Sequence, residues 1–250
     1  MTSEDVARLR VPVDDPQVAA VSIAVHLPAG EYAPDGGRVE ASPVLLVPGA
    51  GADLDDEGLT ALAALLADLG HPAVRANLPF REAGRRGAPR AERSVDAYAT
   101  VLAAVDAHLD APVAWIVGGR SYGGRVASLL VADPPANLPA LAGLLCVSYP
   151  LHPAGRPERL RVAHWPRLHL ATLLVQGTRD ALCTLSLLEA QIPALPGPLR
   201  VHHVPGADHA LRVTAAASPD GRASRPSQTV AGIRPVLAAW LDDVDASVAR

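Results

Sequence analysis

The sequence predicts an α/β protein with a doubly wound, mostly parallel sheet and helices on both faces. Short apolar runs alternate along the chain with longer amphipathic segments. The apolar runs are near-continuous rather than alternating, as expected for strands that helices cover on both sides. The chain has 250 residues, of which 49% are hydrophobic, so it can build a large core. We expect a single domain over residues 1–250.

The expected elements follow one another in a regular order. We expect strands at 18–28, 44–47, 72–78, 112–119, 141–150, 172–176 and 199–204, and helices at 54–70, 94–109, 121–133, 185–195 and 229–248. Asp53 or Asp55 would cap the first helix, Ser94 the second, and Pro235 would kink the last. Residues 79–94 form a basic loop, and 213–228, poor in apolar residues, a mobile surface loop.

The composition excludes several classes of function. The formal net charge is −4 and aromatic residues make up 3%, which argues against nucleic-acid binding. All 22 basic residues are arginine, so chemistry that needs a lysine, such as a Schiff base or a P-loop, is excluded. The two cysteines, Cys146 and Cys183, form neither a disulfide framework nor a metal motif. The N-terminus is polar and no apolar run reaches about 20 residues, so we expect a cytoplasmic protein without membrane contact.

The stretch GGRSYGG, residues 118–124, holds the first candidate for chemistry. Residues 119–123 match G-x-S-x-G, with an apolar strand before them and a helix pattern after them. Glycines there allow the strand and helix to cross closely, which exposes a serine hydroxyl on a strained turn. Ser121 is therefore a candidate nucleophile. The alternative is a serine that only caps a helix.

A serine nucleophile needs a base and a group that orients the base. On a sheet of this kind the expected chain order is Ser, then Asp or Glu, then His. Asp180 follows the strand at 172–176, and His209 follows the last strand. These residues complete a candidate triad with Ser121, and Asp208 is the alternative orienting acid. Two backbone N–H groups would receive the oxyanion, one from Tyr122 and one from Ala50, with Gly51 as the alternative.

Five arginines gather between Arg81 and Arg93 in the basic loop. Such a charge run is either solvated or part of a site for an anionic substrate or a partner. The connection from Tyr149 to Thr172 is too short for a large helical cap, so we expect a minimal lid or none, and an open cleft for a small substrate.

Several blocks together resemble one branch of the α/β-hydrolase superfamily. They are PGAGAD, NLPFREAGRRGAPR, GGRSYGGRVAS, SYPLHPAGRPERLR, LLVQGTRDAL and GADHAL, between about Pro43 and Leu211. The branch is dienelactone-hydrolase-like and includes a subunit of the NSL histone-acetyltransferase complex and a testis-expressed protein. The resemblance implies an α/β-hydrolase fold, Ser121, Asp180 and His209 in the triad positions, and His152 facing the site. Dienelactone hydrolases proper have a cysteine nucleophile, so their substrate class is not inherited here.

These observations lead to the expectation of a serine hydrolase that cleaves an ester, or a thioester or amide, through an acyl-enzyme. Its partner would be a small-molecule ester, and the chemistry needs neither a metal nor an organic cofactor. Acyl transfer to an acceptor other than water would use the same residues. The alternative is a non-catalytic α/β-hydrolase scaffold that acts as a protein-interaction module.

Overall fold

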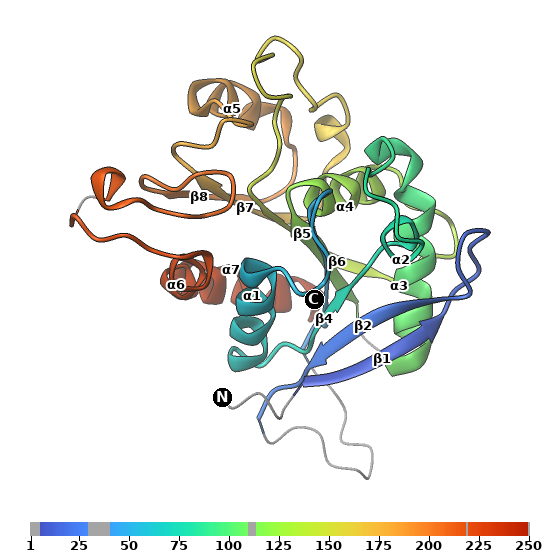
Figure 1. Cartoon of the computed structure of the whole chain (residues 1–250). Helices are drawn as coiled ribbons and strands as arrows, with labels where there is room; N and C mark the ends of the chain where they lie inside the picture. Colours follow the sequence, from blue (N-terminus) through green and yellow to red (C-terminus); the bar gives the residue numbers. More distant parts are fainter. Residues whose placement is uncertain (1–5, 30–40, 110–113, 219, 250) are drawn as a thin grey trace.

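An eight-stranded sheet forms the centre of the computed structural model, which describes residues 6–29, 41–109, 114–218 and 220–249 (Figure 1). The strands lie in the order β1-β2-β4-β3-β5-β6-β7-β8. The pairs β1–β2 and β2–β4 are antiparallel, and all other neighbours are parallel. The predicted doubly wound, mostly parallel sheet is therefore confirmed.

The bounds of the elements are as follows. The strands are β1 (Val6–Pro12), β2 (Ala20–His26), β3 (Val44–Val47), β4 (Ala73–Ala76), β5 (Trp115–Arg120), β6 (Leu141–Val147), β7 (Ala171–Gly177) and β8 (Leu199–Val204). The α-helices are α1 (Glu57–Asp68), α2 (Pro79–Glu82), α3 (Val95–Leu109), α4 (Tyr122–Ala132), α5 (Leu185–Gln191), α6 (Pro226–Gly232) and α7 (Arg234–Val248). Short 3-10 helices are η1 (Ala91–Arg93), η2 (Trp165–Arg167), η3 (Ile192–Ala194) and η4 (Ala215–Ala217).

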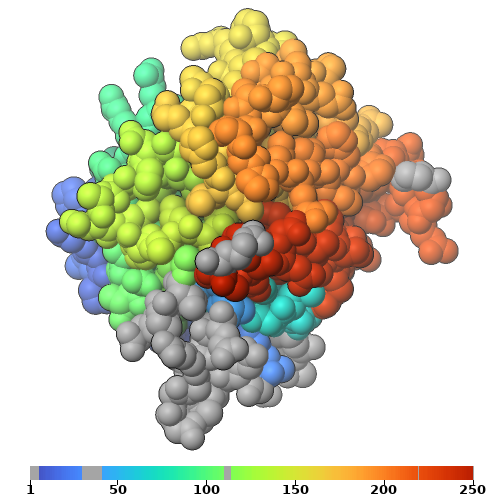
Figure 2. All heavy atoms as spheres, turned by 180° about the vertical axis from the view of Figure 1, so that it is seen from behind, coloured from blue at the N-terminus to red at the C-terminus, as the bar shows by residue number. Residues whose placement is uncertain are grey.

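Helices cover the two faces of the sheet and bury a separate core on each. Helices α3 and α4 lie on one face, where Tyr98 and Leu130 belong to the core. Helices α1, α6 and α7 lie on the other, where Leu62 and Trp240 belong to the core (Figure 1). Seen from behind, α7 (red) lies beside the part of the chain that carries β7 and β8 (orange) (Figure 2). Every residue of β3 and β4 is buried, including Arg75 of β4.

Four local features differ from the sequence expectations. The segment 79–94, expected to be a loop throughout, contains α2 and η1. Strand β1 was not expected, because its side chains are mostly charged or exposed and show no buried run. Helix α1 is capped by Asp56, which accepts from the Leu59 N–H at 3.0 Å, so the prediction of Asp53 or Asp55 was wrong. The expected last helix is two helices, α6 and α7, that meet at Ile233, because Pro235 has no N–H to continue the helical hydrogen bonds.

The connections leave the carboxyl ends of the parallel strands uncovered by any large domain. Between β6 and β7 the chain forms only η2, so no lid domain is present in this described segment. Residues 213–228, expected to be mobile, contain η4 and the start of α6, and Val213 forms bridges with Ala207 and Ser224. Their mobility stays a prediction. Among the described residues, no helix has both the length and the apolar character needed to cross a membrane.

Candidate active site

Ser121 lies on a sharp turn between β5 and α4. Its backbone has φ 52° and ψ −112°, a left-handed conformation that is strained for any residue with a side chain. The turn is possible because Gly119 and Gly123 lie directly against the backbone of Val47 in β3, where a Cβ atom would collide. The strained geometry is that of a nucleophile elbow, which the G-x-S-x-G pattern predicted.

His209 connects Ser121 to Asp180 by two short hydrogen bonds. The Nε2 atom of His209 lies 2.8 Å from the Ser121 Oγ, and its Nδ1 lies 2.7 Å from the Asp180 Oδ2. A carboxylate oxygen can only accept, so Nδ1 carries the proton and Nε2 is free to accept the hydroxyl proton of Ser121. The three side chains come from turns after β5, β7 and β8, so the topology of the sheet brings them together.

The carboxylate of Asp180 is fully buried and held by two further donors. Its Oδ2 accepts from the Gln176 Nε2 at 2.6 Å, and its Oδ1 accepts from the Leu182 N–H at 2.7 Å. Asp208, the alternative orienting acid, has a different place. Its Oδ1 accepts from the N–H groups of Ala210 and Arg212 and so shapes the turn that carries His209. Sequence reasoning missed Gln176, which lies inside β7 with no motif to mark it.

The loop after β3 passes beside Ser121. A Cβ atom on Gly49 would lie 3.7 Å from the Cβ of Ser121, which measures how closely the two backbones approach. The Arg81 Nη2 donates to the carbonyl oxygen of Ala50 at 2.5 Å and thereby fixes the orientation of that peptide. Among the described residues, the N–H groups of Ala50 and Gly51 donate to no backbone carbonyl oxygen. Tyr122 is the first residue of α4, where a helix leaves its N–H without an intrahelical partner.

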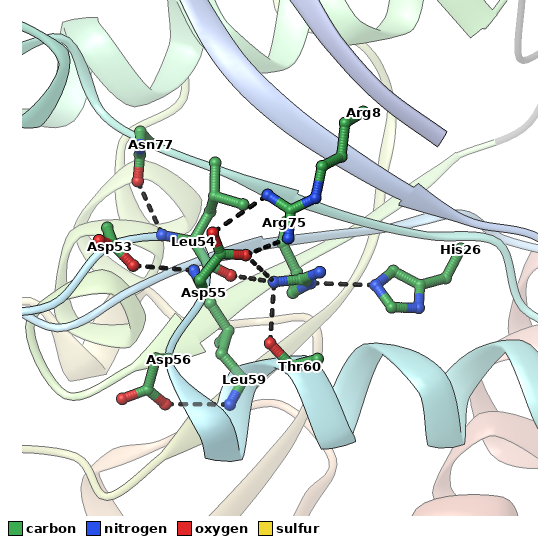
Figure 3. Close-up of polar contacts among 10 residues, drawn as sticks. All are labelled: Arg8, His26, Asp53, Leu54, Asp55, Asp56, Leu59, Thr60, Arg75 and Asn77. Carbon is green, nitrogen blue, oxygen red and sulfur yellow. Dashed lines mark hydrogen bonds and ion pairs between the residues drawn. The ribbon is translucent and has the colours of Figure 1, made fainter. Parts of the chain in front are cut away.

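A buried arginine anchors the far part of this loop (Figure 3). Arg75 in β4 is 1% exposed, and its Nη1 donates to the carbonyl oxygen of Leu54, to Thr60 Oγ1 at 2.8 Å and to Asp55 Oδ1 at 3.2 Å. Its Nε donates to the Nε2 of His26 at 3.0 Å. Burial lowers the pKa of Arg75, while the hydrogen bond and charge of Asp55 act in the opposite direction.

Further contacts complete the anchor shown in Figure 3. The Asn77 Oδ1 accepts from the Leu54 N–H at 2.8 Å, and Arg8 donates to both carboxylate oxygens of Asp55 at 2.6 and 3.0 Å. Both backbone groups of Leu54 therefore have side-chain partners. This arrangement holds the loop between β3 and α1 to the strands that flank it, and no sequence motif indicated it.

An ion pair links the same loop to the residue before Ser121. The Arg120 Nη1 lies 2.7 Å from the Asp56 Oδ2, and both side chains are mostly buried. The Arg120 Nη2 also approaches the carbonyl oxygen of His209 at 3.4 Å. Arg120 therefore contacts both the loop after β3 and the turn that carries His209.

His152 is 3% exposed and does not line the cavities beside Ser121. Its Nδ1 donates to the carbonyl oxygen of Pro153 at 3.0 Å, and its Nε2 accepts from the Thr184 N–H at 3.0 Å. The imidazole thus supports the segment that follows Asp180, and its contact with substrate stays a prediction. The nearby Cys183 is buried, and burial raises the pKa of its thiol to about 12, so it is a packing residue.

Two cavities meet at Ser121. The first, of about 800 Å³, extends between residues 89–92 and 150–161 and includes Tyr122 and Leu182. The second, of about 560 Å³, lies on the other side and includes His209. Ala50 and Ser121 line both cavities, whereas Gly51 lines only the second. Within the described chain, no cluster of three or more His, Cys, Asp or Glu side chains is arranged to hold a metal ion.

Comparisons with known proteins agree with this architecture. The structure is similar to an alpha-beta serine hydrolase homologue from Coxiella burnetii (TM-score 0.67, 18% identity, covering 96% of this chain and 97% of that one). It is similar to XC6422 from Xanthomonas campestris, described as an a/b serine hydrolase without lid (TM-score 0.63, 18% identity, covering 97% of this chain and 96% of that one). It is also similar to dienelactone hydrolase from Anabaena variabilis (TM-score 0.67, 16% identity, covering 96% of this chain and 99% of that one). At these identities the likeness shows the fold.

The sequence comparison identifies the family. Residues 40–231 match the family described as alpha/beta hydrolase domain, which is more than half of the chain. The match and the fold confirm the superfamily that the sequence blocks resemble, while the narrower branch stays a prediction. The chain belongs to the alpha/beta hydrolase domain family.

Proposed function

We propose that this hydrolase cleaves small-molecule carboxylic esters, with thioesters as a related class, through a covalent acyl-enzyme. The observation that carries the proposal is the pair of contacts from Asp180 through His209 to Ser121, at 2.7 and 2.8 Å. A serine hydroxyl is a weak nucleophile alone, and this arrangement supplies both a base and a group that orients the base.

Each step assigns a role to a residue of the site. The Ser121 Oγ attacks the carbonyl carbon while its proton passes to the His209 Nε2. The tetrahedral intermediate expels the alcohol, which takes that proton from His209. Water then attacks the acyl-enzyme with His209 again as base, which releases the carboxylic acid and restores the hydroxyl of Ser121. Asp180 keeps the imidazole in the required tautomer and stabilises its charged form.

We assign the oxyanion donors to the backbone N–H groups of Tyr122 and Ala50. The N–H of Tyr122 lies at the start of α4, where the helix dipole also favours negative charge. Ala50 is preferred over Gly51 because Ala50 lines both cavities that meet at Ser121. Arg81 and the Arg75 anchor support this loop in a fixed conformation before substrate binds.

A fluorophosphonate probe followed by mass spectrometry tests the proposal. We expect a label on Ser121, its absence in Ser121→Ala, and slower labelling in His209→Ala. Ser227→Ala, at a half-buried serine of α6 whose hydroxyl donates to Glu57, is the matched control and should label like the wild type. A folded wild-type protein that takes up no label at Ser121 would contradict hydrolysis and favour the scaffold function. A panel of esters and thioesters then defines the bond that is cleaved.

A further inference from the structure

The two cavities beside Ser121 lie differently relative to His209, the general base of the proposed mechanism. His209 has to hand its proton to the leaving oxygen, so the leaving group must lie on the side of Ser121 that His209 faces. His209 lines the 560 Å³ cavity and is absent from the lining of the 800 Å³ cavity. The larger cavity therefore takes the acyl part of the substrate, and we call it the acyl cavity. The other is the leaving-group cavity.

Arginines dominate the charge of the acyl cavity. Arg125 and Arg161 are half-buried in its wall, and Arg90 and Arg159 are exposed at it. Its acidic lining residues are Glu92 and Glu158, both exposed. Arg125 forms an ion pair with Glu92 and is thereby neutralised. The half-buried charge that remains belongs to Arg161.

The contacts of the Arg161 guanidinium are few. Among the described residues, no carboxylate lies within ion-pair distance of its guanidinium, and its side-chain hydrogen bond is a long one, 3.5 Å from Nη1 to the carbonyl oxygen of Pro150. Burial, and then the positive charge of Arg125, lower the pKa of Arg161. A guanidinium has five N–H donors, so most of its capacity is unused here.

The backbones of both arginines are held in place by the fold. The Arg161 N–H donates to the carbonyl oxygen of Leu151 at 2.8 Å, and its carbonyl oxygen accepts from the Tyr149 hydroxyl at 2.7 Å. Arg125 lies one helical turn after Ser121, and its N–H donates to the Ser121 carbonyl oxygen at 3.0 Å. Glu92 balances only one of these two half-buried positive charges, so the wall keeps an excess of positive charge that an anionic substrate group would offset.

We propose that the acyl cavity binds a carboxylate at the far end of the substrate's acyl chain, through Arg161 and Arg125. The inference rests on the proposed hydrolase function and adds a substrate class to it, the half-esters of dicarboxylic acids. Guanidinium groups match the geometry of carboxylates and form charge-assisted hydrogen bonds with them. Glu92 competes with the substrate for Arg125.

Matched substrates test the proposal. Mono(4-nitrophenyl) adipate carries a free carboxylate on the acyl chain, and its methyl ester is neutral and similar in length. We expect the ratio of kcat/KM, acid over methyl ester, to exceed about 10 in the wild type, since a charge-assisted hydrogen bond corresponds to roughly 10- to 100-fold. 4-Carboxyphenyl hexanoate, with the carboxylate on the leaving group, should show no such preference over its methyl ester.

Three variants assign the preference to residues. Arg161→Gln should lower the ratio about tenfold, and Glu92→Gln should raise it, because Arg125 is released. Arg156→Gln, an exposed arginine on the same connection that does not line the cavity, is the control and should keep the wild-type ratio. A ratio taken within one variant cancels differences in the amount of folded enzyme.

The outcomes separate this inference from the function beneath it. Hydrolysis of the methyl ester with a ratio of 1 or less would overturn the acyl-chain carboxylate while supporting the hydrolase. The inference would also be overturned if Arg161→Gln kept the wild-type ratio of kcat/KM, acid over methyl ester. A preference only for 4-carboxyphenyl hexanoate over its methyl ester would overturn it as well. Labelling rates give a second readout. A fluorophosphonate probe whose alkyl chain ends in a carboxylate should label Ser121 faster than the same probe with that carboxylate converted to a methyl ester does. Failure of every ester and both probes at Ser121 would refute the proposed function, and the inference with it.

Discussion

Mild acid should destabilise this protein through a buried histidine that is not part of the candidate triad. His26 in β2 is 2% exposed, and its Nε2 accepts a hydrogen bond from the Nε of Arg75 (Figure 3). Burial, followed by the positive charges of Arg75 and Arg8, lowers the pKa of His26 from 6.5 to about 4. The unfolded chain therefore binds a proton at higher pH than the folded chain. The free energy of unfolding falls as the pH drops from about 6.5 to about 4, and is unaffected by this group above that window.

The magnitude follows from these two pKa values. Between pH 7 and pH 5, protonation of the unfolded chain at His26 lowers the free energy of unfolding by about 2 kcal/mol. His164, whose pKa burial also lowers to about 4, adds a similar amount. Domains are usually stable by about 5–15 kcal/mol, so the sum of the two effects is large. The carboxylates whose pKa is lowered titrate below this window and contribute little to the change.

Urea unfolding at pH 7, 6 and 5 measures the effect. In His26→Gln the side-chain oxygen can accept from Arg75 but cannot bind a proton, so this variant should lose about 2 kcal/mol less than the wild type between pH 7 and pH 5. His169→Gln, at an exposed histidine, is the matched control and should follow the wild type. If the pH dependence of His26→Gln runs parallel to that of the wild type, the pKa of His26 is the same in the folded and unfolded chains and the reasoning is refuted.

Three further predictions concern the site and its support. Thermal unfolding should show that Gly123→Ala destabilises the protein by about 3 kcal/mol or more, because the new Cβ would lie 2.6 Å from the carbonyl carbon of Val47. Gly232→Ala is the control and should leave the stability nearly unchanged, because its new Cβ would have no atom within 4 Å. Tyr98→Phe should lower the free energy of unfolding in urea by about 1–3 kcal/mol, because the Tyr98 hydroxyl accepts from the buried Gly118 N–H at 3.0 Å. An unchanged urea midpoint would show that a water molecule takes the place of the hydroxyl. Asp180→Asn should lower kcat of ester hydrolysis roughly 10³- to 10⁴-fold with little change in folding, and near-wild-type turnover would show that Asp180 does not orient His209.

Local sequence signals were sufficient for most of the fold and for the three central side chains. Apolar runs predict buried strands directly, because a strand between two layers of helices has no polar face. Ser121 and Asp180 each follow such a run, and His209 follows the half-buried edge strand β8. Parallel strands place the residues at their carboxyl ends along one edge of the sheet. Strand β1 was missed because Arg8 and Arg10 interrupt its apolar residues and most of its side chains are exposed, so only its pairing with β2 makes it a strand.

The sequence by itself determined the layered sheet, the strained turn at Ser121 and the order of the residues that surround it, because each depends on short-range patterns of apolar residues and glycine. Only the tertiary structure decided which charges become partners. Arg75 meets Asp55 and His26, and Arg125 meets Glu92, whereas no carboxylate among the described residues pairs with Arg161. These contacts join residues far apart in the chain, and an arginine in a sequence gives no sign of which acid it will reach. The candidate triad is therefore readable in the sequence, whereas the charge of the acyl cavity depends on how the connections fold over the sheet.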